Sequence, residues 1–297
     1  MPEQLTPSPA AFAEFSPLRL EEPLARWTTL RVGGPAEWFF EPRRPEDLAA
    51  LLTALHKAQI PYRLLGGGAN VLAPDAGVRG AVIHTGALRR IFLEGTALRC
   101  WPGATIQQTV RAAAENGLHG LELLMGVPGH IGGALAMNAG SADFGIWDVV
   151  EEVTVWEPEG PWKARARADF DPQYRNGNLG QAVSLEILLR LEKSTKVEVK
   201  ITQEALLRKK NQTQPVTLFS AGCAFKNPLG ESAGRLLDQA GMKGVSVGRA
   251  SVSTLHANFV VTEPGATSAD VLTLLEKMAS AVLEYAGITL ERELIVW

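Results

Sequence analysis

The stretch PYRLLGGGANVL spans residues 61–72 and contains three consecutive glycines. Its first residues read as a short β-strand that runs directly into the glycines. Consecutive glycines allow positive φ angles and let a ligand approach the main chain closely. Successive N–H groups in such a turn form a concavity that binds anions. A plain tight turn explains a glycine run about as often, so the stretch predicts a phosphate-binding loop or a structural turn.

Two common phosphate loops are excluded by the residues that follow. The dinucleotide fingerprint Gly-x-Gly-x-x-Gly fails because position 71 is Val71. The nucleoside-triphosphatase loop fails because no Gly-Lys-Ser/Thr follows the glycines. A phosphate loop at this position would therefore belong to another class.

A second stretch rich in small residues, VPGHIGGALAMNAG, spans residues 127–140. Glycines and alanines surround one polar side chain, Asn138, in an otherwise apolar segment. Close packing around a flat or phosphorylated ligand requires such small residues. A buried structural loop is the equally good alternative on composition alone.

Three further segments carry chemistry-bearing side chains: 174–176 with Arg175, 221–228 with Cys223, and the terminal Glu293. Each has an ordinary explanation, because surface arginines and terminal acids are usually solvated and a lone cysteine is usually a small buried hydrophobe. The five histidines show no close pairing that predicts a metal site. His256 opens an expected strand and is as consistent with a structural role as with ligand contact.

Patterning around these segments predicts a mixture of helices and strands. The expected strands are 27–32 and 36–40 around a turn, then 61–65, 81–85, 149–157, 181–191 and 257–261. The expected helices are 45–58, 105–116 with Gly117 as its stop, 203–211, 232–240 and 267–286. Residues 1–20, with four prolines, are expected to form a loose arm, and 193–196 an exposed turn. The fold class is α+β.

Composition excludes several classes of protein. The 297 residues suggest about two domains at ~150 residues each. With 46% hydrophobic residues, 21% charged residues and a net charge of −3, the chain is neither disordered nor a nucleic-acid binder. The two cysteines form no Cys-x-x-Cys pair, and the apolar stretch 123–137 is too short and broken to span a bilayer. The N-terminus lacks a signal peptide, so we expect a cytoplasmic protein with free thiols.

Taken in order, the motifs resemble those of one family, the UDP-N-acetylenolpyruvoylglucosamine reductases of peptidoglycan precursor synthesis. The resemblance covers residues 27–293. It is carried by the segments TTLRVGGPA (28–36), 66–72, 128–140, 174–175, 222–228, SAGRLL (232–237) and HANF (256–259). Each segment is weak alone, and their joint order is specific.

The resemblance implies a fold and its division along the chain. Two subdomains would bind FAD in the manner of the vanillyl-alcohol-oxidase (PCMH-type) flavoproteins, and a C-terminal α+β domain would bind substrate. The implied segments are an arm (1–22), the two FAD-binding subdomains (23–84 and 85–194) and the substrate-binding domain (195–297). The chain resembles the shorter family type, which lacks an extra tyrosine-bearing loop.

The resemblance also implies cofactors and their contacts. FAD would bind non-covalently, and NADPH would be the co-substrate that reduces it. No metal is implied. The implied FAD contacts are Leu65, Gly66, Gly67, Gly68, Ala69, Asn70, Val71, Pro128, Gly129, Ile131, Gly132, Gly133, Asn138, Ala139 and Gly140.

The implied reaction delivers hydride to the enolpyruvyl methylene carbon and a proton to its neighbour. By resemblance, Arg175 stabilises the charge that develops on the substrate carboxylate, and Glu293 donates to the same group. A donating carboxyl must be protonated, so the pKa of Glu293 is expected to be raised. Cys223 occupies the position of the proton donor, where many members carry serine. A thiol, with an ordinary pKa of ~8.5, suits that role, and Ser220 is the nearest substitute hydroxyl.

Substrate contacts carry over less completely. Tyr174, Lys226 and Asn227 match family positions for the nucleotide sugar. Arg208 and Lys210 lie near the expected phosphate contacts but match loosely. The family's Gly-Ala-Tyr-Gly after the Asn-Ala-Gly motif is absent, since residues 140–145 read GSADFG.

Two other functions compete with this one. A flavin oxidase of the same superfamily would tether FAD covalently, with His84 or His130 as candidates, and would leave Cys223 and Glu293 without a role. A non-catalytic homologue could bind nucleotide sugar as a regulatory module. The reductase remains the preferred hypothesis: a monomer that acts on a small nucleotide sugar and binds neither nucleic acid nor membrane.

Overall fold

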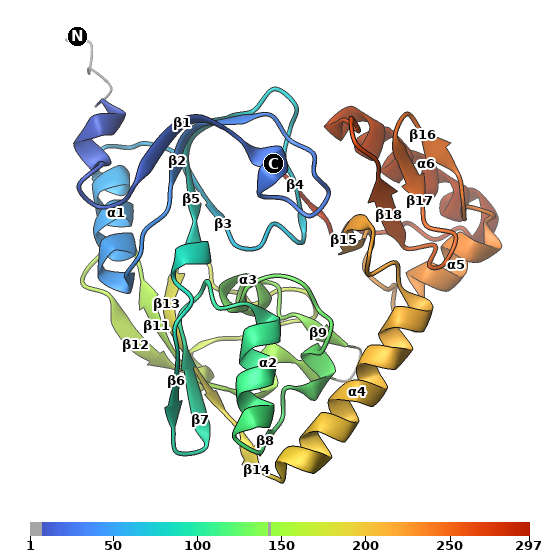
Figure 1. Cartoon of the computed structure of the whole chain (residues 1–297). Coiled ribbons are helices and arrows are strands. Elements are labelled where there is room, and N and C mark those ends of the chain that lie inside the picture. Colours follow the sequence, from blue (N-terminus) through green and yellow to red (C-terminus); the bar gives the residue numbers. More distant parts are fainter. Residues whose placement is uncertain (1–7, 142–143) are drawn as a thin grey trace. The chain divides into compact units, whose positions relative to one another are not determined.

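The computed structural model describes residues 8–141 and 144–297 (Figure 1). The chain forms two compact units, each built from several separate stretches. The first unit takes the described residues up to Glu22, 36–67 and 79–206, and the second takes 23–35, 68–78 and 207–297. The domains expected from the sequence are four consecutive segments that end at residues 22, 84, 194 and 297. The two compact units instead combine stretches that are separated along the chain.

The first unit contains a four-stranded sheet and the helix that covers it. Across the sheet the order is β1 (Leu18–Pro23), β2 (Pro35–Phe40), β5 (Val78–His84) and β3 (Tyr62–Leu65). β3 runs parallel to β5 and places Leu65 opposite His84. Helix α1 (Pro45–Lys57) buries Leu48, Leu51, Leu52 and Leu55, the face that the sequence predicts. The glycine loop therefore leaves the sheet from the end of β3.

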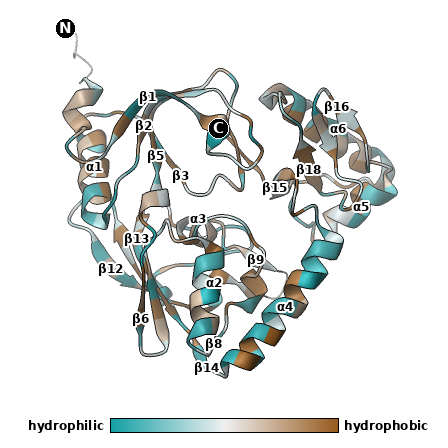
Figure 2. Cartoon of the chain, in the orientation of Figure 1, coloured by the Kyte–Doolittle hydropathy of each residue, from teal (hydrophilic) through white to brown (hydrophobic). Residues whose placement is uncertain are grey.

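The second sheet of this unit has five strands, and each of its four neighbouring pairs is antiparallel. Its order is β12 (Lys163–Ala166), β11 (Val150–Trp156), β13 (Val183–Arg190), β7 (Ala97–Cys100) and β6 (Ile91–Glu94). The central strand β13 is almost wholly buried and hydrophobic (Figure 2). Helices α2 (Ile106–Glu115) and α3 (Ile131–Ala136) contribute to the same core. Thr105 caps α2 through a capping box with Gln108, as the sequence predicts.

Short elements complete the first unit. They are the two-residue ladders β8 (Leu118–His119) with β14 (Glu192–Lys193) and β9 (Gly140–Ser141) with β10 (Phe144–Gly145), and the 3-10 turns at Pro9–Phe12, Thr85–Ala87, Glu122–Leu124, Ile146–Asp148 and Arg167–Asp169.

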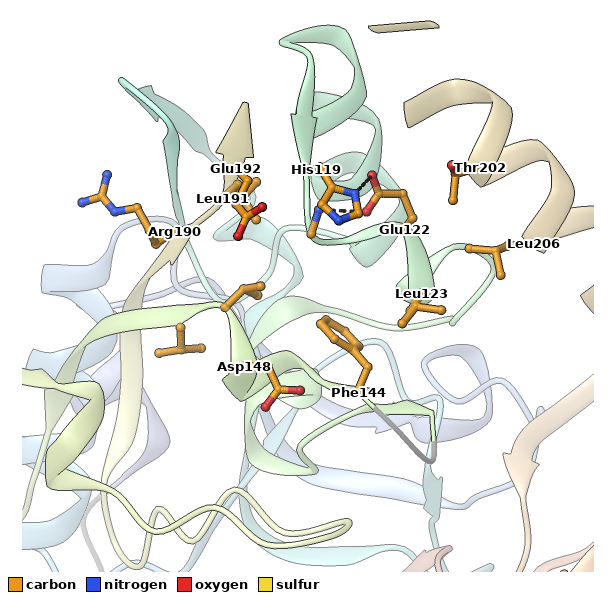
Figure 3. Close-up of a pocket in the computed structure, with 13 residues that line it drawn as sticks. His119, Glu122, Leu123, Phe144, Asp148, Arg190, Leu191, Glu192, Thr202 and Leu206 are labelled. Carbon is orange, nitrogen blue, oxygen red and sulfur yellow. Dashed lines mark hydrogen bonds and ion pairs between the residues drawn. The ribbon is translucent and has the colours of Figure 1, made fainter. Parts of the chain in front are cut away.

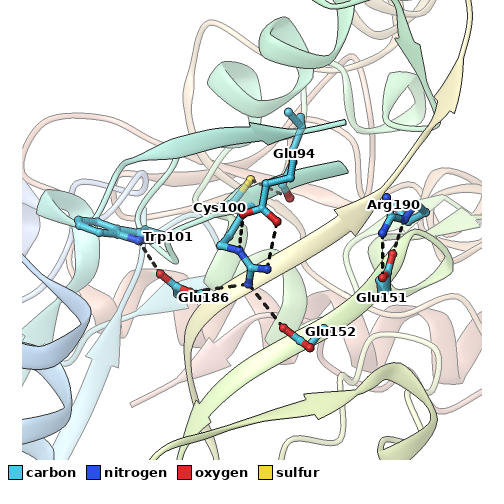
Figure 4. Close-up of polar contacts among 9 residues, drawn as sticks. Glu94, Cys100, Trp101, Glu151, Glu152, Glu186 and Arg190 are labelled. Atoms are coloured by element: carbon cyan, nitrogen blue, oxygen red, sulfur yellow. Dashed lines mark hydrogen bonds and ion pairs between the residues drawn. The ribbon is translucent and has the colours of Figure 1, made fainter. Parts of the chain in front are cut away.

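Charged side chains cover the polar face of the second sheet (Figure 4). Arg99 contacts Glu94, Glu152 and Glu186 at 2.7, 3.5 and 3.7 Å, and Trp101 Nε1 donates to Glu186. The next residue, Cys100, lies on the buried face because successive strand residues alternate. Exposed ion pairs of this kind contribute little to the free energy of unfolding, so the sheet is stabilised mainly by its buried apolar face.

The second unit has a four-stranded sheet with two helices. Its antiparallel order is β15 (Phe219–Cys223), β18 (Phe259–Thr262), β17 (Ala250–Val252) and β16 (Ser246–Val247). Helices α5 (Ala233–Gln239) and α6 (Ser268–Ala286) match their predicted ranges closely. A 3-10 turn (Leu24–Arg26) and the parallel pair β4 (Val71–Leu72) and β19 (Ile295–Val296) complete the unit. Leu30, Val32 and Leu72 belong to its buried core.

Helix α4 (Lys196–Thr213) begins seven residues before the predicted helix 203–211. Thr195 Oγ1 accepts from the Glu198 N–H, and the Glu198 carboxylate accepts from the Thr195 N–H. This reciprocal cap starts the helix where the charged run predicts an exposed turn. The helix passes from the first compact unit to the second between residues 206 and 207, whereas the sequence places a domain boundary near 195.

Two other predictions are wrong. Residues 27–32 form turns rather than a strand, because Thr28 Oγ1 donates to Val32 O, the Thr29 N–H donates to Gly68 O, and Arg31 has φ +55°. Residues 1–7 of the expected loose arm lie outside the described part, but its remainder forms the Pro9–Phe12 turn and β1. The buried Phe12 packs in the same hydrophobic core as the buried leucines of α1 and so anchors that segment.

Candidate active site

In the first unit, the two glycine-rich stretches touch main chain to main chain. A Cβ on Gly67 would lie 2.8 Å from Gly129 Cα, and one on Gly66 would lie 3.7 Å from His130 Cβ. Only residues without side chains allow the first of these approaches. The sequence treats 61–72 and 127–140 as separate motifs, and the fold of the first unit brings Gly66 and Gly67 of the one against Gly129 and His130 of the other.

The second stretch is held in place from behind. The Ile131 and Gly132 N–H groups donate to Ala104 O and Pro102 O, both at 2.8 Å. A Cβ on Gly132 would lie 2.7 Å from the Pro102 side chain, whereas no described atom lies within 4 Å of one on Gly133. One face of α3 is therefore packed, and the face at Gly133 is open.

Two histidines lie beside this glycine contact, with ring centroids 5.9 Å apart. His84 Nδ1 lies 2.9 Å from Glu41 Oε1, and Glu41 also pairs with Arg19. Burial, together with the charge of His84, lowers the pKa of His130 to about 4. Among the described residues, His130 Nδ1 is buried with no hydrogen-bond partner. A bound polar group would satisfy that atom.

Arg175 lies in a tight turn of the first unit. Gln173 and Asn176 exchange main-chain hydrogen bonds of 2.7 and 3.1 Å, and Arg175 between them has φ +57°. Its Nη1 donates to Gly140 O at 3.2 Å, and its guanidinium lies 5.0 Å from the centre of the Tyr174 ring. A non-glycine residue in the left-handed region is uncommon and is retained where surrounding bonds impose it. The second glycine-rich stretch and Arg175 are thus in direct contact.

Asn138 has a structural role in this arrangement. It has φ +43°, its Nδ2 donates to Gln173 O at 3.0 Å, and its Oδ1 accepts from the Trp147 N–H at 3.4 Å. The side chain therefore ties the end of α3 to the turn that carries Arg175. Residues 142 and 143 of the segment that departs from the family pattern lie outside the described part.

In the second unit, Cys223 ends β15 beside a bulge. The pairing of β15 with β18 shifts register between Ser220 and Cys223, and Gly222 has φ +76°. Ser220 Oγ accepts from the Gly222 N–H at 3.3 Å, so that hydroxyl is part of the bulge. Cys223 is half-buried there.

The buried Asn258 fixes the chain after the thiol. Its Oδ1 accepts from the Phe225 N–H at 3.0 Å, its Nδ2 donates to Phe225 O at 2.8 Å, and its own carbonyl accepts from the Ala224 N–H. The sequence marks 256–259 only as a landmark and misses this role. His256 Nδ1 accepts from the Asn258 N–H at 3.2 Å, which supports the structural interpretation of that histidine.

The other thiol is excluded from chemistry by its position. Cys100 is fully buried in the second sheet of the first unit, and desolvation raises its pKa to about 12 (Figure 4). A thiolate does not form at neutral pH under these conditions.

Glu293 lies on the C-terminal segment of the second unit, which is hydrogen-bonded to the chain after Cys223. The Glu293 N–H donates to Ala224 O at 2.9 Å, and the Lys226 N–H donates to Glu291 O at 2.8 Å. Residues from two segments about 70 positions apart therefore share one ladder.

Gly68, in the same unit, packs against residues 27 and 28, where an added Cβ would lie 2.1 Å from Trp27 O.

Comparison with known proteins identifies the family. A family model for the C-terminal domain of UDP-N-acetylenolpyruvoylglucosamine reductase matches residues 214–297, and a model for an FAD binding domain matches 36–163. UDP-N-acetylenolpyruvoylglucosamine reductase of Trichlorobacter lovleyi is 40% identical over 277 residues, covering 93% of this chain and 91% of the relative. The second such reductase of Symbiobacterium thermophilum is 36% identical over 283 residues, covering 94% and 92%.

This chain belongs to the UDP-N-acetylenolpyruvoylglucosamine reductase (MurB) family. The crystal structure of MurB from Thermus caldophilus superposes with a TM-score of 0.82 at 36% identity, covering 95% of this chain and 98% of that one. The resemblance inferred from the sequence is confirmed, and so is the expected α+β fold with an FAD-binding part and a MurB C-terminal domain. The individual site residues stay predictions, which the geometry above constrains.

Two of the MurB substrate contacts expected from the sequence, Lys226 and Asn227, have partners within the second unit. Lys226 Nζ pairs with Glu291 Oε1 at 2.6 Å, and Asn227 Oδ1 accepts from the Ala233 N–H at 3.0 Å, which caps α5. Lys210 is half-buried, and desolvation lowers its pKa to about 8. A bound anion would stabilise the charged form of Lys210.

A cavity of about 670 Å³ lies elsewhere in the first unit (Figure 3). His119, Glu122, Phe144 and Arg190 line it, with His119 Nδ1 3.0 Å from Glu122 Oε1. It contains none of the predicted MurB site residues. Among residues 8–141 and 144–297, the structure has no helix both long and apolar enough to cross a membrane.

Proposed function

We propose that this chain reduces UDP-N-acetylenolpyruvoylglucosamine to UDP-N-acetylmuramate, with FAD as bound cofactor and NADPH as reductant. Membership of the MurB family supports the reaction, and the FAD-binding family match supports the cofactor. The observation that carries the proposal is the ladder that joins the residue after Cys223 to Glu293, a thiol and a carboxyl from distant segments. A flavin oxidase with a covalent tether would give that pair no task.

The residues in the first unit fit FAD. Gly67 packs against the Gly129 main chain, and Gly66 lies beside His130. With the open face at Gly133 and with His130 Nδ1, which has no hydrogen-bond partner among the described residues, they form a surface for a flat, anionic group. When bound, reduced FAD would supply hydride to the enolpyruvyl methylene carbon. We propose that the glycines, rather than charged side chains, make the closest approach to FAD.

Arg175 is proposed to bind the substrate carboxylate. Negative charge develops there as hydride arrives, and donors fixed in advance stabilise it without reorganising. The turn closed by Gln173 and Asn176 and the bond to Gly140 O hold the guanidinium before substrate binds. Glu293 is proposed to donate a second hydrogen bond to the same carboxylate.

Cys223 is proposed to donate the proton that completes the reaction. The bulge at Gly222 and the Asn258 clamp fix the main chain on either side of the thiol. A positioned general acid of this kind is worth ~10²–10⁴ in rate. We further propose that the enzyme acts as a monomer in the cytoplasm.

An anaerobic visible spectrum of the purified protein tests the proposal directly. NADPH should bleach the flavin band, and UDP-N-acetylenolpyruvoylglucosamine should then restore it. Bleaching without recovery would show a different acceptor on the same fold. A protein that cannot be loaded with FAD would refute the reductase function and favour a non-catalytic nucleotide-sugar-binding protein.

A further inference from the structure

Asn70, which the sequence assigns to the cofactor, directs its side chain at the C-terminal segment of the second unit. Its Nδ2 donates to Glu293 O at 2.9 Å, and its own main-chain carbonyl accepts from the Ile295 N–H at 3.1 Å. These two bonds join residues more than 220 positions apart. An amide already engaged with the protein has a task there that is independent of a cofactor.

The bonds around Asn70 belong to a longer attachment. β4 and β19 pair in parallel with Ile295 opposite Val71 and Val296 opposite Leu72, and the Trp297 N–H donates to Leu72 O. Leu294 is buried in the core of the unit. The segment is thus secured on the C-terminal side of Glu293 by main-chain pairing and one apolar anchor.

Glu293 itself is held on both sides of its peptide unit. Its N–H donates to Ala224 O, the residue after Cys223, while its carbonyl accepts from the Asn70 amide. The first bond sets the distance between the carboxyl-bearing and thiol-bearing segments. The second fixes the tilt of the main chain from which the Glu293 side chain departs.

We propose that Asn70 is a positioning residue that orients Glu293 for its hydrogen bond to the substrate. The inference rests on the proposed function, because it gives Glu293 a substrate to act on. A shift of about 1 Å in a reacting group costs as much as 10²-fold in rate, so one main-chain bond at this place affects catalysis. The Asn70 amide binds the main chain that carries the Glu293 carboxyl, so Asn70 acts through Glu293 and is not itself a catalytic residue.

The side-chain chemistry at this position makes a sharp distinction possible. Asn70→Ala removes the donor and leaves the Glu293 carbonyl without it. Asn70→Asp keeps the shape but sets a carboxylate oxygen against a carbonyl oxygen, which repel each other. When that carboxyl is protonated at low pH it can donate again, so the defect of the Asn70→Asp variant should shrink as pH falls.

The experiment measures the two half-reactions separately by anaerobic stopped flow in FAD-loaded protein. Both Asn70 variants should reduce flavin with NADPH at the unmodified rate and bind FAD within about 3-fold of the unmodified affinity. Reoxidation by UDP-N-acetylenolpyruvoylglucosamine should slow 10- to 100-fold, in keeping with the positioning cost above. Asn116→Ala is the matched control, because Asn116 Nδ2 also donates to a main-chain carbonyl, Ala112 O at 2.8 Å, at the end of α2 in the first unit.

A double-mutant cycle with Glu293→Ala decides whether Asn70 acts through Glu293. In the Glu293→Ala background, Asn70→Ala should slow reoxidation by less than about 2-fold, since the donor that Asn70 orients is gone. Additive losses, a fall of more than 10-fold in FAD affinity, or slowed flavin reduction would overturn the inference and make Asn70 a cofactor contact. Failure of the unmodified protein to be reoxidised would instead refute the proposed function, and the inference with it.

Discussion

The reactivity of the two cysteines is decided by the residues next to them. Cys223 follows a glycine with φ +76°, pairs with Phe259 directly after a register shift, and is half-buried. Cys100 lies in the middle of a paired sheet and is fully buried. The same side chain is thus a candidate acid at one position and an inert apolar group at the other.

We therefore predict that Cys223→Ala will leave flavin reduction by NADPH unchanged and slow reoxidation by substrate ~10²–10⁴-fold, the value of a general acid. Cys223→Ser should retain measurable turnover because a hydroxyl can donate the same proton. Single-turnover absorbance traces distinguish the two half-reactions. Ser220→Ala serves as the control, since that hydroxyl belongs to the bulge, and unmodified turnover in Cys223→Ala would remove the thiol from the mechanism.

His130 makes stability dependent on pH. In the unfolded chain its pKa has the ordinary value of 6.5, and burial with the His84 charge lowers it to about 4 in the folded protein. Between these values the unfolded state binds more protons, so stability is complete above pH 6.5 and falls as pH drops toward 4. His84, whose pKa burial also lowers, changes stability in the same direction.

The expected loss of unfolding free energy between pH 7 and pH 5 is on the order of 2 kcal/mol from His130. Urea unfolding at the two pH values, at equal cofactor occupancy, measures it. His130→Gln cannot titrate and should show a smaller difference between the two pH values. An identical pH dependence in both proteins would contradict the assignment.

At the scale of elements, α3 and the glycine loop contain glycines in two different surroundings. Gly67 needs its missing side chain because another main chain, Gly129, occupies the space. Gly133, on α3, has no described atom within 4 Å of an added Cβ, so no contact within the described chain requires a glycine there. The sequence resemblance assigns both glycines to the FAD site. The structure shows that only Gly67 is also required by packing within the protein.

Gly67→Ala should lower both the melting temperature and FAD affinity, because the added methyl displaces the Gly129 main chain. Gly133→Ala should leave the apoprotein as stable or up to ~1 kcal/mol more stable, as expected for alanine in a helix. Its FAD affinity should nevertheless fall at least about 10-fold, since a small interface of main chain and ligand tolerates little added volume. Thermal unfolding with FAD titration tests both, and full FAD affinity in Gly133→Ala would remove that face from the cofactor site.

The elements also show where local sequence is sufficient. Helices α1, α2 and α6 follow from spacing, caps and stops within their own residues, including the capping box of Thr267 with Asp270. The turns at 27–32 do not, because Thr29 bonds to Gly68, which is distant in sequence. The early start of α4 was locally encoded by Thr195 and Glu198, but the surrounding charges obscured it.

On the scale of the molecule, the second unit is completed by two N-terminal stretches. Leu30, Val32 and Leu72 are at most 2% exposed within its core, and Thr262 Oγ1 donates to Leu30 O at 2.6 Å. The Asp75 carboxylate accepts from the Ser268 N–H and hydroxyl at the start of α6. Burial of three such side chains is worth roughly 5–9 kcal/mol, similar to the total stability of a small domain.

A fragment of residues 195–297 should therefore fail to fold alone, although it contains the whole MurB C-terminal family match. It lacks β4 and three core side chains and would expose the apolar surface that they cover. Amide dispersion in a two-dimensional NMR spectrum, with the full chain as reference, measures the outcome. A dispersed spectrum with cooperative unfolding would show that 23–35 and 68–78 are dispensable.

The sequence alone determined the family, the fold class, most helices and the small residues that close approach requires, because these depend on local spacing and composition. Tertiary structure alone decided that Gly67 packs against Gly129, that the Asn70 amide donates to the Glu293 carbonyl, and that Asn258 binds the chain after Cys223. Each of these is a hydrogen bond or contact between residues far apart in sequence. The type of a side chain determines which hydrogen bonds it is able to make. The path of the chain determines which partners come within reach, and so which of those bonds form.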